Sequence, residues 1–238
     1  MTLNEMIDQR KSCRSFTGIP VDGEMMEKIL SFDMKPLYPQ IKVRMDVVSR
    51  DKVRCLCPWT TPQLIAVYSE ETEGYLENVG FLFQQMDLYL QSLGLGVCWL
   101  GMGKMNPKNA PAVDGMKFVI MLAFGHPKGD PVRHGARDFK RKALSQISDI
   151  PDPKLEPARL APSSVNSQPW YFAHEGNAIH AYCTAKGPIG HMNRIDMGIA
   201  LAHLYAANPG AFHAFKAETP PAVPSCKYIC SCTLQREE

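Results

Sequence analysis

The longest hydrophobic pattern in the sequence spans residues 74–96, where apolar residues cover most faces of an expected helix. Such a composition predicts a helix buried in the core, and Gly94 can supply the left-handed residue that ends it. Shorter amphipathic patterns predict helices at residues 2–12 and 21–30, the second starting near Asp22. The first of these two helices is expected to end in basic residues.

Runs rich in β-branched and aromatic residues predict strands. They lie at residues 41–49, 63–69 and 117–127, and the last is expected to be a central strand. Between the long helix and this strand, residues 97–104 are expected to form a loop, because the segment around them is rich in glycine.

The pattern restarts near residue 150 and repeats in the same order. It predicts a strand at residues 177–183, an apolar helix at 193–212 that Pro209 should end early, and a strand at 226–234. We therefore interpret the chain as a diverged internal duplication, with one half at residues 1–148 and the other at 149–238.

Composition and charge narrow the class of protein. The 238 residues include 45% hydrophobic and 21% charged residues, which is ordinary for a soluble globular protein. The 26 basic and 24 acidic residues nearly balance, which argues against nucleic acid as a partner. The N-terminal residues contain no apolar run typical of a signal peptide, and no stretch approaches the roughly 20 apolar residues of a membrane span. We expect a cytoplasmic protein without a membrane partner.

Eight cysteines raise the question of metal or disulfide chemistry. They include clusters at residues 55–57 and 226–232, but neither cluster has paired C-x-x-C spacing. The interpretation we favour is that they are reduced thiols acting as small buried hydrophobic residues, so no metal site is predicted.

Three stretches could carry chemistry. The segment RKSCRSF at residues 10–16 is either a basic cap on the preceding helix or a phosphate clamp made of arginines and serine hydroxyls. The segment APSSVNSQPW at 161–170 offers hydroxyls and amides between two prolines, for a ligand or for its own backbone. In GLGVCWLGMGK at 94–104, glycines would let a ligand approach the backbone, although the dinucleotide fingerprint is absent.

Other chemistry has weaker support. No hydrolase or zinc-protease motif is present, and Cys98 lacks a visible histidine and acid that could make it a thiolate nucleophile. His203 lies in an apolar helix, where a core histidine is the simpler interpretation than a ligand.

Together these stretches resemble the nitroreductase superfamily of FMN-dependent oxidoreductases. RKSCRSF is similar to its R-x-S-x-R-x-F start, APSSVNSQPW to its P-S-S-x-N-x-Q-P-W loop and GLGVCWLG to its G-L-G-x-x-W-x-G segment, while FGHP followed by KRKAL is similar to its ending. In ordinary members the first two motifs lie close together in the sequence, and here they are far apart. The chain thus resembles the internally duplicated single-chain branch, in which one chain imitates the usual homodimer.

The resemblance implies a fold and a set of site residues. The fold would be α+β and nitroreductase-like, with two related halves forming a pseudodimer whose central antiparallel sheets are flanked by helices. The FMN phosphate and ribityl chain would be held by Arg10, Lys11, Ser12 and Arg14, assisted by Lys140 or Arg141. The flavin ring would face the backbone of Cys98, Trp99, Leu100 and Gly101, with Pro162, Ser163, Ser164 and Asn166 lining the isoalloxazine and ribityl groups.

The implied activity follows from the cofactor, and no catalytic side chain is predicted. NAD(P)H would pass a hydride to flavin N5, and a small electron-poor acceptor such as a nitroaromatic or a quinone would then be reduced in ping-pong order. Two alternatives stay open: a flavin-binding, flavin-storing or flavin-modifying protein without this turnover, and a flavin-free interaction protein. The acceptor, the choice between NADH and NADPH, and the choice between monomer and dimer also stay open.

Overall fold

The computed structural model describes residues 1–57, 59, 61, 63–108, 115–135, 138–184 and 190–235. The chain divides into two compact units. Unit 1 comprises Met1–Tyr75 and Met86–Gly135, and unit 2 comprises Leu76–Gln85 and Ala136–Glu238. The long helix α3 (Tyr75–Ser92) therefore contributes residues to both units. The predicted division into residues 1–148 and 149–238 stays a prediction.

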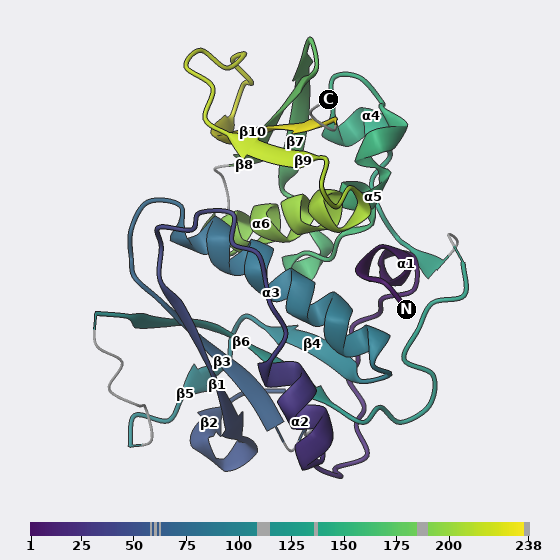
Figure 1. Cartoon of the computed structure of the whole chain (residues 1–238), viewed down its shortest axis with the longest axis vertical. Coiled ribbons are helices and arrows are strands. Elements are labelled where there is room, and N and C mark those ends of the chain that lie inside the picture. The colour runs from purple at the N-terminus through teal and green to yellow at the C-terminus, as the bar shows by residue number, and fades with distance from the viewer. Residues whose placement is uncertain are drawn as a thin grey trace. The chain divides into compact units, whose positions relative to one another are not determined.

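Unit 1 is built on a four-stranded antiparallel sheet (Figure 1). Its strands, in spatial order, are β1 (Val43–Ser49), β3 (Gln63–Ser69), β6 (Lys117–Gly125) and β4 (Gly96–Leu100). A two-stranded ribbon, β2 (Val53–Arg54) with β5 (Lys104–Met105), and the helices α1 (Leu3–Ile7) and α2 (Gly23–Leu30) complete the unit. Asp22 caps α2, because its carboxylate accepts a hydrogen bond from the Met25 backbone N–H at 2.8 Å.

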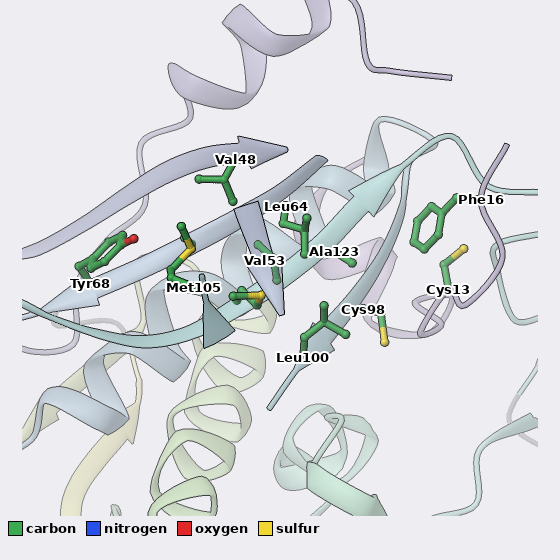
Figure 2. Packing of buried hydrophobic residues seen from close by; sticks show 12 residues of the cluster. Cys13, Phe16, Val48, Val53, Leu64, Tyr68, Cys98, Leu100, Met105 and Ala123 are labelled. Carbon is green, nitrogen blue, oxygen red and sulfur yellow. The ribbon is translucent and has the colours of Figure 1, made fainter. Parts of the chain in front are cut away.

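The core of unit 1 includes a cluster of buried side chains from the sheet, the ribbon and the segment after α1 (Figure 2). Leu64 and Ala123 lie at paired positions of β3 and β6, and Cys98 of β4 pairs with Ala123. Cys13 and Phe16 join the same cluster from outside the sheet. Their burial ties the segment Arg10–Phe16 to the sheet through apolar contact.

Unit 2 contains a second four-stranded antiparallel sheet. In spatial order its strands are β7 (Trp170–Glu175), β8 (Ala178–Thr184), β10 (Cys226–Leu234) and β9 (Phe212–Phe215). Besides residues Leu76–Gln85 of α3, the described part of this unit has the helices α4 (Leu144–Ile147), α5 (Glu156–Leu160) and the long α6 (Gly190–Ala207), with short 3-10 turns at Pro153–Leu155 and Ser164–Asn166. A further 3-10 turn, Arg50–Lys52, lies in unit 1.

The two sheets share one topology. In each, two strands precede a long helix, two strands follow it, and the last strand in sequence lies between the second and the third. The long helix is α3 in the first pattern and α6 in the second. The predicted fold class is confirmed: the chain is α+β, with two related halves and antiparallel sheets.

Within unit 2, α3 and α6 meet at a pair of glycines. A Cβ on Gly80 would collide with the backbone carbonyl of Ile195, and a Cβ on Gly198 would collide with that of Glu77. Each glycine therefore contacts the residue three positions before the other. Such reciprocal contact is the pattern of a twofold-related pair, so Gly80 and Gly198 are equivalent positions of the two helices.

Most expected elements are present. The strands at 63–69 and 226–234 have the predicted bounds, β6 is an interior strand, and Gly94 after α3 has a φ of +80°. Helix α6 ends at Ala207, two residues before Pro209, as expected. Helix α1 ends at Ile7, so the basic residues Arg10 and Lys11 lie beyond it and are not its cap.

Two predictions were wrong. Residues 97–104 are not a loop, because Gly96–Leu100 forms β4, whose pairing with β6 outweighs the glycine-rich composition. Trp170, interpreted as the end of a loop, begins β7. The short strand β9 within the expected helix 193–212 and the following turn was also missed, since Pro209 and Gly210 separate it from α6.

The cysteines are free thiols, and five of the eight are buried. Cys98, Cys183, Cys230 and Cys232 lie in strands, as the favoured interpretation required. Among the described residues, no group of histidine, cysteine or acidic side chains is placed to hold a metal ion. Within that same part of the chain, no helix has the length and apolar character needed to cross a membrane.

Candidate flavin site

In unit 1, the arginine-rich segment lies along the edge strand β4. Ser12 forms a parallel bridge with Val97, and the Cys13 backbone N–H donates to the Val97 carbonyl at 2.8 Å. Gly96 allows this approach, because a Cβ there would lie 2.5 Å from the Cys13 Sγ. The fold thereby brings two of the predicted motifs, Arg10–Phe16 and the glycine-rich segment, next to each other.

Arg10 is held from α3 by a buried acid. Its Nε donates to Asp87 Oδ1 at 3.2 Å and its Nη2 to Ser12 Oγ at 3.3 Å, and only 1% of the Arg10 side chain is exposed. Gln91 Nε2 also donates to Asp87 Oδ1, at 2.6 Å, while Gln91 Oε1 accepts from the Lys11 backbone N–H at 2.8 Å. Asp87 and Gln91 therefore fix both the side chain of Arg10 and the backbone that follows it.

The neighbouring cations differ from Arg10 in exposure. Lys11 and Arg14 are both exposed, so their charges face solvent. The Arg133 side chain donates to the Arg10 carbonyl, and the Arg133 backbone N–H donates to the Gln9 carbonyl at 2.8 Å. The segment thus combines one fixed, buried guanidinium with two solvent-facing cations.

Strand β4 offers the candidate site backbone groups, and its cysteine, Cys98, is not a reactive nucleophile. The Cys98 side chain is buried, and burial raises the pKa of its thiol to about 11. At neutral pH this thiol is protonated, which argues against a thiolate nucleophile. Because β4 is an edge strand, alternate backbone N–H and C=O groups between Cys98 and Leu100 point away from β6. Gly101 lies in the turn that follows.

In unit 2, the predicted polar loop packs against the segment before α4. We call residues 162–168 the Ser-Asn loop. Arg141 donates from Nη1 to Asn166 Oδ1 at 2.7 Å and from Nε to the Ala161 carbonyl at 3.0 Å. Asn166 Nδ2 donates in turn to the Lys140 carbonyl at 2.8 Å. The structure therefore brings together Lys140, Arg141 and Asn166, which lie about 25 residues apart in sequence.

The two ends of the Ser-Asn loop are fixed by hydrogen bonds. Ser163 Oγ accepts from the Gln168 backbone N–H at 2.8 Å, and Gln168 Oε1 accepts from the Lys142 backbone N–H at 2.7 Å. Ser164 donates its backbone N–H to both carboxylate oxygens of Asp196 at 3.0 Å. Pro162 is buried at the start of the loop.

The backbone of this loop is strained. Val165, Asn166 and Gln168 have positive φ values of 48°, 57° and 48°. A β-branched residue such as Val165 is a genuine outlier in this region, and its side chain is 87% exposed. Backbone outliers of this kind persist only where surrounding contacts enforce them, and they concentrate at functional sites.

The predicted residues thus form one cluster in each unit. Unit 1 holds Arg10, Lys11, Ser12, Arg14 and Cys98 to Gly101, and unit 2 holds Lys140, Arg141, Pro162, Ser163, Ser164 and Asn166. Sequence reasoning missed Asp87, Gln91 and Asp196, which anchor these residues. The sequence did contain a signal for the two acids. Each lies inside an otherwise apolar helix, and a charge buried there needs a partner.

A comparison with protein-family models matches residues 2–208 to the family described as "Putative TM nitroreductase". The chain belongs to this nitroreductase family. The resemblance inferred from the motifs is thereby confirmed. No curated protein matches this nitroreductase-family chain.

Three solved structures are similar to this chain over different lengths. The Thermotoga maritima MSB8 protein for which the family is named has a TM-score of 0.69 and 19% sequence identity, over 100% of this chain and 95% of its own. An FMN-dependent nitroreductase of Clostridium difficile R20291 has a TM-score of 0.46 and 14% identity, over 57% of this chain and 93% of its own. A nitroreductase family protein of Clostridium difficile 630 has a TM-score of 0.47 and 20% identity, over 61% and 96%. The first of these supports the nitroreductase fold for the whole chain.

Proposed function

We propose that this chain is an FMN-dependent oxidoreductase that takes electrons from NAD(P)H and passes them to a small electron-poor acceptor, such as a nitroaromatic or a quinone. The observation that carries the proposal is the strained Ser-Asn loop, which presents hydroxyl and amide groups and is held in place by Arg141, Lys142 and Asp196. Family membership supplies the reaction class.

The donor set of unit 2 fits an FMN molecule chemically. Ser163 and Ser164 offer hydroxyls, and Asn166 offers an amide that can donate and accept, which suits a ring edge or a ribityl chain that also does both. Lys140 is exposed and cationic, and Arg141 is fixed beside Asn166. These two cations suit a phosphate.

The donor set of unit 1 fits the same cofactor. Lys11 and Arg14 are exposed cations, and Arg10 is oriented by Asp87 and Ser12. The proposal assigns Lys11, Arg14 and Ser12 to the phosphate and ribityl end. The predicted role of Arg10 changes: its side chain is buried, so it would support that end by holding Ser12 in place. The backbone of Cys98, Trp99, Leu100 and Gly101 is assigned to the flavin ring.

Bound FMN would supply the hydride chemistry, and the residues of this chain would bind and orient it. Backbone N–H groups of β4 and the amide of Asn166 would stabilise negative charge that develops on the ring. The buried Cys98 thiol, protonated at neutral pH, would hold no reactive charge near the acceptor.

The first experiment is the absorption spectrum of the purified protein. We expect flavin bands, and release on denaturation of a flavin that chromatography identifies as FMN. NADH or NADPH oxidation with a nitroaromatic or a quinone should follow. A colourless protein that takes up no added FMN would refute the proposal, whereas FMN binding without turnover would favour a flavin-storing or flavin-modifying protein.

Variants then test each cluster separately. Arg14→Ala should weaken FMN binding about 10-fold to 100-fold, the loss expected for one hydrogen bond to a charged group. Arg44→Ala removes an exposed arginine of the same unit from strand β1 and should leave the FMN dissociation constant unchanged. Asn166→Ala is the matching test in unit 2. Unchanged affinity in both Arg14→Ala and Asn166→Ala would remove the site assignment.

A further inference from the structure

Asp196 is a buried acid in the middle of α6 that the motifs do not account for. Asp196 is only 2% exposed, and both of its carboxylate oxygens accept a hydrogen bond from the Ser164 backbone N–H at 3.0 Å. The Ser164 hydroxyl donates to Oδ1 at 3.3 Å. A carboxylate only accepts hydrogen bonds, so it matches the two donors that Ser164 presents.

The contact falls at the position where the loop enters its strained conformation. Ser164 immediately precedes Val165, the first of the loop residues with a positive φ. Two other contacts hold the far side of the loop: Arg141 binds Asn166, and Lys142 binds Gln168. Asp196 is the anchor at the near side, and it is the one that comes from a long helix.

The first half of the chain provides an internal comparison. Because Gly80 and Gly198 are equivalent, the residue two positions before each glycine is also equivalent, and this residue is Asn78 in α3 and Asp196 in α6. The Ser-Asn loop is absent from the first half, where the residues after α2 read SFDMKPLYPQ. The carboxylate therefore occurs on the helix whose half retains the loop, and an uncharged amide occurs on the other.

We propose that Asp196 is a positioning residue, which holds the Ser-Asn loop in the conformation that binds FMN. This inference rests on the proposed function. By engaging the Ser164 N–H and hydroxyl proton, Asp196 leaves the lone pairs of the Ser164 oxygen directed at a ligand, and it prevents the backbone at Val165 from relaxing to negative φ.

The experiment uses the full chain at pH 8 and compares Asp196→Ala, Asp196→Asn and the control Asn208→Ala. Asn208 is matched to Asp196 because it is a polar residue adjoining α6, where its Nδ2 donates to the Leu204 carbonyl at 2.9 Å, away from the loop. One measurement is hydrogen exchange of the amides of residues 163–168 without FMN. The other is the FMN dissociation constant from flavin fluorescence.

Asp196→Ala should speed exchange of the loop amides about 10-fold or more and weaken FMN binding about 10-fold to 100-fold, because a charge-assisted anchor is lost. Asp196→Asn should lie between Asp196→Ala and the wild type, since its carbonyl oxygen can still accept the Ser164 N–H. Asn208→Ala should change neither quantity. If Asp196→Ala does not fold, the isosteric Asp196→Asn decides the question.

The outcomes separate this inference from the proposed function. A wild-type protein that takes up no FMN refutes the proposed function and, with it, the FMN role of Asp196. A wild type that binds FMN, with loop exchange and affinity unchanged in both Asp196 variants, overturns the positioning role alone. Losses in the Asn208→Ala control as large as those in the Asp196 variants would also overturn it, because they would reflect a general loss of stability.

Discussion

The helices α3 and α6 hold equivalent places in the two strand patterns, yet the buried acids that contact the two motifs, Asp87 and Asp196, lie at different positions along them. Two residues before the paired glycines stand Asn78 in α3 and Asp196 in α6. Seven residues after them stand Asp87 in α3 and Tyr205 in α6. Asp87 binds Arg10, whereas Tyr205 packs its ring against aromatic neighbours at centroid distances of 5.4 and 5.9 Å.

Of the buried acids in these helices, Asp87 and Asp196 therefore each lie in the half that retains the motif they contact, whereas Glu77 of α3 pairs with Arg194 instead. Asp87 serves the arginine-rich segment, and Asp196 serves the Ser-Asn loop. Burying a carboxylate without donors is costly, so a half that lacks the motif has no use for the acid. The comparison shows that each half retains a motif together with the acid that holds it: Arg10 with Asp87 in one, and Ser164 with Asp196 in the other. We call each of these a matched pair.

The largest effect should come from separating the buried pair in unit 1. Arg10→Ala would leave Asp87, which is fully buried, without its cation, and we expect a loss of about 3–5 kcal/mol in the free energy of unfolding. Urea unfolding measures this loss. The double variant Arg10→Met with Asp87→Leu should recover most of it, because the unpaired charge is gone. A loss in Arg10→Ala no larger than that of the exposed control Arg44→Ala would contradict the matched-pair interpretation.

The buried acid of unit 2 should show itself as a pH dependence. Desolvation raises the pKa of Asp196 from 3.8 to about 7, against the opposing effect of the Ser164 hydrogen bonds. Between about pH 4 and pH 7 the folded chain keeps a proton that the unfolded chain releases, so stability falls as pH rises through this window. Below this pH window Asp196 is protonated in both the folded and the unfolded chain, and above it Asp196 is ionised in both.

The fall should reach about 4 kcal/mol, at about 1.4 kcal/mol for each unit of pKa. Asp196→Asn should remove this part of the pH profile, and Asn78, which does not titrate, adds nothing to it. Melting temperatures of wild type and variant from pH 4 to pH 8 provide the measurement. A variant profile that parallels the wild-type profile would show that another group is responsible.

The glycine pair should give equal, somewhat smaller effects. Gly80→Ala and Gly198→Ala each push a methyl group into the backbone of the facing helix, at a cost of about 1–3 kcal/mol. Gly23→Ala is the matched control, because a Cβ there meets open space. Clearly unequal losses in the two variants, measured by thermal unfolding, would break the equivalence on which the comparison rests.

The smallest effect is expected at Cys98. Cys98→Ala removes a buried thiol and should cost about 1 kcal/mol of stability, while FMN affinity stays within about twofold, because only the backbone of this residue is assigned to the flavin. Thiol reagents should also modify Cys98 slowly at neutral pH, since the pKa of its thiol is about 11. Loss of turnover with full FMN binding would instead indicate a chemical role for this thiol.

The long elements were predictable because their patterns are local. Apolar periodicity gave α3, runs of β-branched and aromatic residues gave β3 and β6, and the restart of the pattern near residue 150 gave α6 and β10. The strand β4 was missed because its glycine and cysteine carry little strand preference, and it exists through pairing with β6, more than 20 residues further along the chain. The strand β9 depends in the same way on β10.

In the candidate site, too, local features were predictable and long-range contacts were not. The motif residues could be named from the sequence because they are contiguous and resemble a known family. Their anchors could not, because Asp87 lies 77 residues from Arg10, and Asp196 lies 32 residues from Ser164. Only the folded chain brings each acid to its donor, although an acid within an apolar helix was a visible hint.

The division of α3 between the units limits how this chain can be cut. A fragment of residues 136–238 would lack Leu76–Gln85, which includes Gly80 and its close approach to α6. Such a fragment would expose apolar surface of α6 to water and should aggregate unless a peptide covering α3 is supplied in trans. Split-protein designs based on this chain should therefore keep α3 whole, and place the break in the sequence that follows unit 1.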